Sequence, residues 1–169
     1  MIIPTLTTDR LVLRAFREDD VPALTALHSD PEVMRYLRPD GEVETKPRQA
    51  WDYIALHMGH WLLKGCGKWA LAERATDEFI GRVGYFHPPY EWPGLELGWT
   101  IGREHWGKGY ATESSRLALD WGAEKFGRSA IISAIIRGND RSVRVAERLG
   151  GRHARDEVLH GAPALIYAY

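Results

Sequence analysis

The chain has 169 residues, a formal net charge of −1 and a single cysteine, Cys66. This length predicts one domain, residues 1–169, with a core of its own, and the near-zero charge gives no electrostatic reason to expect a nucleic acid or an anionic membrane as partner. One cysteine excludes an internal disulfide, and the start shows no signal-peptide pattern. No apolar stretch of the chain approaches the ~20 residues that span a bilayer, so we expect a cytoplasmic protein.

The first third of the chain predicts one strand followed by helices. Residues 10–16 are apolar or β-branched enough for a strand. Carboxylates at residues 18–20 suit the start of a helix, and Asp30 followed by Pro31 can begin another short one. Residues 45–63 then predict a longer, aromatic-rich helix.

The middle of the chain predicts strands. Residues 68–73 and 79–86 are strand patterns joined by a polar turn, which is typical of a hairpin. Residues 87–94 contain three prolines and must form a loop, because proline cannot donate to a ladder. A further strand, 95–101, precedes a helix pattern that runs to about Phe126.

The last third alternates again between the two types of element. Residues 130–136 form a continuous apolar run, as expected for a strand buried on both faces. A helix is predicted from about 140 to 149, with Gly150 to end it, and the tail 164–169 reads as a final strand. The fold class is therefore α/β, a mixed sheet flanked by helices.

A glycine-rich turn joins the strand 95–101 to the helix after it. Small residues there let a ligand approach the backbone, and the first N–H groups of the helix, with its dipole, favour a phosphate. A P-loop would need a hydroxyl where Gly109 stands, and a Rossmann fingerprint would need glycine where Thr112 stands. The turn consists of Trp106, Gly107, Lys108, Gly109, Tyr110, Ala111 and Thr112.

The spacing Gly109-x-Ala111 matches the end of the acyl-CoA pyrophosphate loop Q/R-x-x-G-x-G/A, so the chain resembles the GNAT superfamily of N-acetyltransferases. Trp106 replaces the usual Gln or Arg, and the run from Trp106 to Glu113 instead resembles the branch of ribosomal-protein N-terminal acetyltransferases. Segments 8–14, 30–34 and 139–150 extend the resemblance over nearly the whole chain. It implies a GNAT-like, mostly antiparallel sheet flanked by helices, and acetyl-CoA held by residues 106–112 and Asn139.

The resemblance also implies catalytic residues. GNAT enzymes often carry a carboxylate on the strand before the loop, which removes the amine proton through water; here that residue is Glu96. A solvated strand-end carboxylate is the alternative. The tyrosine that usually acts as acid is replaced by Ala146, and Ser142 is the hydroxyl expected to hydrogen-bond the departing thiolate. The alternative is that Asn139 and Ser142 only cap a helix.

The acceptor is expected to be a primary amine, on a small molecule or a protein N-terminus. Glu91 and Trp92, in the proline-rich loop, are predicted to bind it, because a carboxylate and an aromatic face attract a cation. The other function that the sequence leaves open is a non-catalytic CoA-binding module, favoured by the missing tyrosine. A homodimer is compatible with the sequence. No metal is expected, because His57 and His60 lack further ligands at recognisable spacing.

Overall fold

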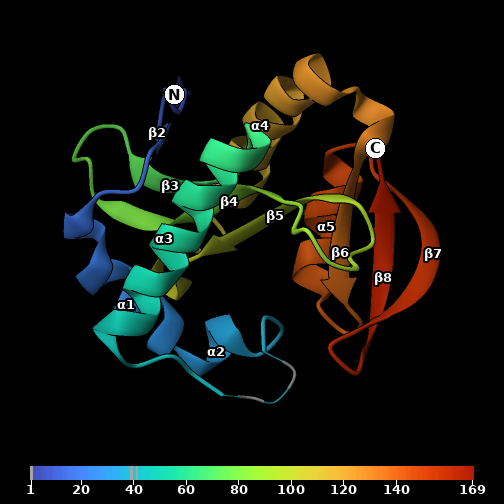
Figure 1. Ribbon diagram of the computed structural model, residues 1–169, viewed down its shortest axis with the longest axis horizontal. Coiled ribbons are helices and arrows are strands. Elements are labelled where there is room, and N and C mark those ends of the chain that lie inside the picture. The colour runs from blue at the N-terminus through green and yellow to red at the C-terminus, as the bar shows by residue number, and fades with distance from the viewer. Residues whose placement is uncertain (1, 39, 41) are drawn as a thin grey trace.

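An eight-stranded sheet runs through the protein, with its strands in the order β1-β2-β3-β4-β5-β6-β8-β7 (Figure 1). The computed structural model describes residues 2–38, 40 and 42–169. Every neighbouring pair is antiparallel except β5 and β6, which confirms the predicted mixed, mostly antiparallel sheet. The strands are β1 (Leu6–Thr7), β2 (Leu11–Arg14), β3 (Lys68–Glu73), β4 (Phe79–Phe86), β5 (Leu95–Ile101), β6 (Ile131–Ile136), β7 (Arg152–Leu159) and β8 (Ala162–Ala168).

Helices cover both faces of the sheet. Residues of α4 such as Leu119 pack with Leu71, Val83 and Leu97 in the larger hydrophobic cluster. The opposite face is covered by α1 and α3, whose apolar side chains form a second cluster with Ala70; Figure 1 shows α3 crossing in front of the strands. The helices are α1 (Val21–Ser29), α2 (Pro31–Met34), α3 (Pro47–Lys64), α4 (Tyr110–Phe126) and α5 (Asp140–Arg148).

The register of β3, β4 and β5 decides which side chains share a face. Lys68 pairs with Gly84 and Gly84 with Gly98, while Arg82 pairs with Thr100. Because side chains alternate along a strand, those of Lys68, Arg82 and Thr100 project to the face that carries α1 and α3. Polar residues therefore collect on one side of strands whose other side is apolar.

The predicted strands 68–73, 79–86 and 95–101 have the bounds that the structure shows. The long helix begins at Pro47, two residues later than predicted, because Lys46 before the proline is extended. Neither β1 nor β7 was predicted. β7 is an edge strand with charged, exposed residues, so its sequence lacks an alternating apolar pattern. Within the described residues no helix has the length and apolarity to cross a bilayer.

Candidate active site between β5 and β6

The strands β5 and β6 begin side by side and then separate. Their parallel pairing comprises Leu95 with Ile131 and Glu96 with Ile132, whereas β6 stays paired with β8 as far as Ile136. A cavity of about 980 Å³ lies where they part, and both strands line it. Beyond the paired residues, the facing edges have backbone groups that do not bond to each other, so an extended ligand can pair with them.

Ser133 fixes the point at which the strands separate. Its hydroxyl donates to the Leu97 carbonyl at 2.6 Å and also contacts the Tyr169 hydroxyl at 2.8 Å. This link from β6 to β5 holds the apex of the opening, although the backbone ladder has already ended there.

The turn before α4 has the free donors that the sequence predicts. The first hydrogen bond within the helix runs from the Glu113 N–H to the Gly109 carbonyl at 3.0 Å, which leaves the N–H groups of Tyr110, Ala111 and Thr112 without a partner in the helix. Gly107 and Gly109 have φ of 78° and 82°, the left-handed region that favours glycine. Six of the seven predicted turn residues line the cavity; Lys108 does not.

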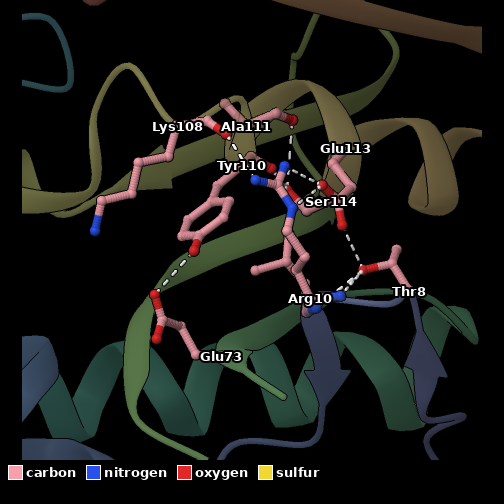
Figure 2. Close-up of polar contacts among 9 residues, drawn as sticks. Thr8, Arg10, Glu73, Lys108, Tyr110, Ala111, Glu113 and Ser114 are labelled. Carbon is pink, nitrogen blue, oxygen red and sulfur yellow. Dashed lines mark hydrogen bonds and ion pairs between the residues drawn. The ribbon is translucent and has the colours of Figure 1, made fainter. Parts of the chain in front are cut away.

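Arg10, which immediately precedes β2, links this turn to the N-terminal strands of the sheet (Figure 2). Its guanidinium donates to the Lys108 carbonyl at 3.1 Å and pairs with Glu113, which also accepts from the Thr8 hydroxyl. The Tyr110 hydroxyl in turn donates to Glu73 at 3.0 Å. The carbonyl between the two glycines is therefore engaged by a cation, so that it does not oppose an anion at the neighbouring N–H groups.

Helix α5 supplies the other side of the same end of the cavity. Asn139 caps it by accepting from the Ser142 N–H at 3.2 Å, so the capping role is real. Both residues also line the cavity, and the cap leaves the Asn139 amide NH₂ and the Ser142 hydroxyl available to a ligand. Three arginines that the sequence analysis did not select also line it: Arg141, Arg144 and Arg148. Their i, i+3, i+7 spacing was the available signal, because such residues share one helix face.

Trp106 serves as a platform in place of the usual polar residue. Its indole N–H donates to the Ile101 carbonyl at 2.8 Å, and the Arg141 guanidinium lies 4.2 Å from its ring centre. The ring thus holds a cation over the cavity by a cation–π contact.

Glu96 lines the cavity where β5 and β6 part. Burial raises the pKa of its carboxyl above the ordinary range, although the charge of Lys68 and a hydrogen bond from the Trp92 indole, at 2.9 Å, oppose this. The alternative of a freely solvated carboxylate is therefore not what the structure shows. A partly buried carboxylate with a raised pKa suits a general base that works near neutral pH.

Lys68, which sequence reasoning missed, lies beside this carboxylate. It is 6% exposed, and its ammonium donates to the carbonyls of Gly84 and Gly98 at 2.7 and 3.2 Å. Burial lowers its pKa to about 8. Gly98 makes room for it: a Cβ there would lie 2.8 Å from the ammonium and 3.2 Å from the Glu96 carboxylate.

Not all predicted residues come together. Glu91 is exposed and does not line the cavity, and Trp92 reaches the cavity through its hydrogen bond to Glu96. Ala146 is fully buried against Ile135 and Tyr167, so it faces the core rather than the ligand space. His57 and His60 lie buried on α3, and no group of three potential metal ligands occurs within the described part of the chain.

Comparison with known proteins agrees with this geometry. Residues 10–152 match the family described as "Acetyltransferase (GNAT) domain". The chain belongs to the GNAT acetyltransferase family. It is 30% identical to the N-acetyltransferase p20 of Bacillus licheniformis, over 86% of this chain and 80% of that protein. It is therefore an acyltransferase, and the predicted family and enzyme class are confirmed.

Solved structures of GNAT proteins superpose closely on this fold. An acetyltransferase from Agrobacterium tumefaciens is 30% identical with a TM-score of 0.84, covering 100% of this chain and 95% of that one. RimL, a ribosomal L7/L12 α-N-protein acetyltransferase solved with coenzyme A, shares the fold with a TM-score of 0.81 at 17% identity, over 98% of this chain and 97% of that one.

Acetyl-CoA is the acyl donor of this GNAT protein, and the residues of the cavity fit it. Free N–H groups at the start of α4 and the three arginines of α5 suit its phosphates, and the parting strand edges suit an extended arm. The space beside the turn is open to a ligand, because a Cβ placed on Gly107 would have no other protein atom within 4 Å. When bound, acetyl-CoA supplies an activated acetyl thioester.

Trp92→Phe is expected to shift the acid limb of the kcat/KM profile to higher pH. The indole N–H lowers the pKa of Glu96, so its loss raises that pKa further, and the carboxyl is protonated over a wider range. pH–rate profiles of the variant and the parent check this. Trp51→Phe on the exposed side of α3 is the control, and an unshifted limb in Trp92→Phe would mean that the hydrogen bond does not tune the base.

Proposed function

We propose that this protein transfers the acetyl group of acetyl-CoA to a primary amine, carried by a small molecule or a peptide N-terminus, with Glu96 as general base. The observation that carries the proposal is the position of Glu96. It stands where β5 and β6 part, inside the cavity, and has a raised pKa. The same opening leads to the phosphate-binding turn before α4.

An amine attacks a thioester only in its neutral form. A lysine-type amine has a pKa near 10.4 and an α-amine near 7.7–8.0, so both are largely protonated at neutral pH. Glu96 removes this proton, directly or through water, and a carboxylate of raised pKa gives the transfer a larger driving force. Lys68 stays close by, and its positive charge favours the ionised form of Glu96 before the amine arrives.

The departing thiolate requires less help, because a thiol has a pKa of about 8.5. With Ala146 turned into the core, Ser142 is the hydroxyl on α5 that lines the cavity. It donates a hydrogen bond to the sulfur as the bond to the acetyl group breaks. Asn139 and the turn residues 106–112 hold the donor in place.

Ser142→Ala is expected to lower kcat by about 10²-fold or less, with little change in the KM for acetyl-CoA. The backbone N–H of residue 142 still caps onto Asn139, so α5 keeps its start. Steady-state kinetics with saturating amine check the expectation. A rise in the acetyl-CoA KM at constant kcat would instead assign Ser142 to donor binding.

The test of the proposed function is release of free thiol from acetyl-CoA by the purified protein in the presence of a panel of primary amines. The panel contains peptides with free N-termini, the same peptides with blocked N-termini, and small amines. The proposal expects amine-dependent thiol release and mass-spectrometric acetylation of the free-amine members. Binding of acetyl-CoA without any amine-dependent release would contradict it and favour a CoA-binding module.

A further inference from the structure

Arg82 is a buried cation that lines the active-site cavity, and within the described residues it has no ion-pair partner. It is 8% exposed and projects from β4 to the face that carries α1 and α3. Its Nε donates to His28 Nε2 at 3.2 Å, and its guanidinium lies 4.5 Å from the ring centre of Tyr53. Within the described residues it forms no ion pair with a carboxylate, and the Glu96 carboxylate, which lines the same cavity, acts on it only through space.

The contact with His28 does not neutralise this charge. Burial, with the charge of Arg82 adding to it, lowers the pKa of His28 to about 3, so the imidazole is neutral. Its Nδ1–H donates to Glu44 at 3.0 Å, and its Nε2 lone pair is therefore free to accept from Arg82. The contact fixes the orientation of the guanidinium and uses one of its five N–H donors.

Thr100 stands beside Arg82 with an unused hydroxyl. The two residues are directly paired across β4 and β5, and both line the cavity. Thr100 is 6% exposed, and its Oγ1 is buried with no hydrogen-bond partner. Buried polar groups are normally satisfied and buried charges are normally paired, so this pair of unsatisfied groups indicates a missing ligand group.

The ligand group comes from the acceptor rather than from the phosphates of the donor. The phosphate-binding turn opens α4, which packs on the opposite face of the sheet from Arg82. Along β5, Thr100 is four residues from Glu96 on the same face, about 13 Å between Cα atoms at the usual rise per residue. A molecule whose amine reaches Glu96 can therefore extend a second group toward Arg82.

We infer that the acceptor carries a carboxylate, separated by several bonds from the amine that is acetylated, and that Arg82 and Thr100 bind this carboxylate. The inference rests on the proposed acetyl transfer and names the class of its acceptor. A planar guanidinium without an ion-pair partner matches a carboxylate in a bidentate manner, and the Thr100 hydroxyl adds a further donor. A doubly charged phosphate is less suited, because Glu32 and Glu96 line the same cavity.

The test compares linear ω-amino carboxylates of increasing chain length with their carboxamide twins, by kcat/KM for thiol release from acetyl-CoA. The parent protein is expected to prefer the carboxylate twin by about 10- to 100-fold at the best length. Arg82→Gln abolishes this preference, Arg82→Lys retains part of it, and Thr100→Val reduces it several-fold. The KM for acetyl-CoA stays unchanged in all three variants. Arg103→Gln, an exposed arginine paired with Asp30, is the control and keeps the full preference.

Equal kcat/KM for the twins in the parent, or a preference that survives in Arg82→Gln, would overturn the inference while leaving acetyl transfer intact. If no amine releases thiol, acetyl transfer itself fails, and calorimetric titration of the CoA-saturated protein with the same twins decides the subsite. Tighter binding of the carboxylate than of its matched carboxamide, with the difference lost in Arg82→Gln, supports the carboxylate subsite. Equal binding of the two compounds overturns it. Should Arg82→Gln fail to fold, as judged by its melting curve, the isosteric Thr100→Val takes its place.

Discussion

Replacing Glu96 with glutamine is expected to lower kcat/KM for the amine by about 10²- to 10⁴-fold near neutral pH, the range by which a positioned general base accelerates proton transfer. Glutamine keeps the size of the side chain and can still accept from the Trp92 indole, so the loss reports the base rather than the packing. The affinity for CoA, measured by calorimetry, should stay nearly unchanged.

The pH dependence of the Glu96→Gln defect has a definite sign. In the parent, kcat/KM falls below the raised pKa of Glu96, because the base becomes protonated. The variant lacks this limb, and its residual rate rises as solvent deprotonates the amine. The defect is therefore largest at low and neutral pH and shrinks as the pH approaches the amine's own pKa. A profile that superimposes on the parent's would remove Glu96 from the mechanism.

Glu91→Gln separates this role from that of the neighbouring loop carboxylate. Glu91 is exposed and lies outside the cavity lining. The sequence predicts it as an acceptor-binding residue, in which case its loss raises the KM for the amine and leaves the acid limb in place. If the acid limb of the kcat/KM profile shifts in Glu91→Gln but not in Glu96→Gln, Glu91 is the general base and Glu96 is not.

Gly109→Val is the change expected to abolish CoA binding. The residue lies at φ 82° immediately before α4, where a side chain would stand beside the free N–H groups of the helix start. Around it the protein itself leaves room, since a Cβ would meet only Arg10 at 3.7 Å. The valine therefore occupies space that the pyrophosphate needs, and calorimetric titration with CoA checks for the loss.

Backbone strain is the competing explanation, and Gly65→Val is the matched control. Gly65 ends α3 at φ 68° and ψ 16°, the same left-handed conformation as Gly109 at φ 82° and ψ 2°. A side chain at either position costs about 1–2 kcal/mol of conformational strain, but Gly65 does not line the cavity. Equal loss of CoA affinity in both variants would mean that backbone strain alone explains the loss. Normal CoA affinity in Gly109→Val would contradict the phosphate site.

The sequence predicts the central strands well because each has a strong local signal. The segments 68–73, 79–86 and 95–101 are apolar runs ended by turns or prolines, and each forms a strand with those bounds. The edge strand β7 was missed, since the solvent on its exposed side removes the periodicity on which such a prediction depends. The glycine turn and the free N–H groups before α4 could be predicted because they are local: consecutive residues supply both.

The buried cations of the cavity, Lys68 and Arg82, could not be predicted in the same way. Lys68 and Arg82 are single charges within apolar strands, and such a residue is most often solvent-exposed. Their shared face depends on the register of three strands, and their burial depends on α1 and α3 packing over that face. The role of Gly98 follows only from this register, since its missing side chain leaves the space that the Lys68 ammonium fills.

A crystal structure of this protein with coenzyme A is the most direct test of the donor site. We expect the pyrophosphate on the N–H groups of Tyr110, Ala111 and Thr112, and the thiol between β5 and β6 within reach of Glu96 and Ser142. Coenzyme A bound away from the start of α4, or with its thiol on the far side of the sheet from Glu96, would contradict it.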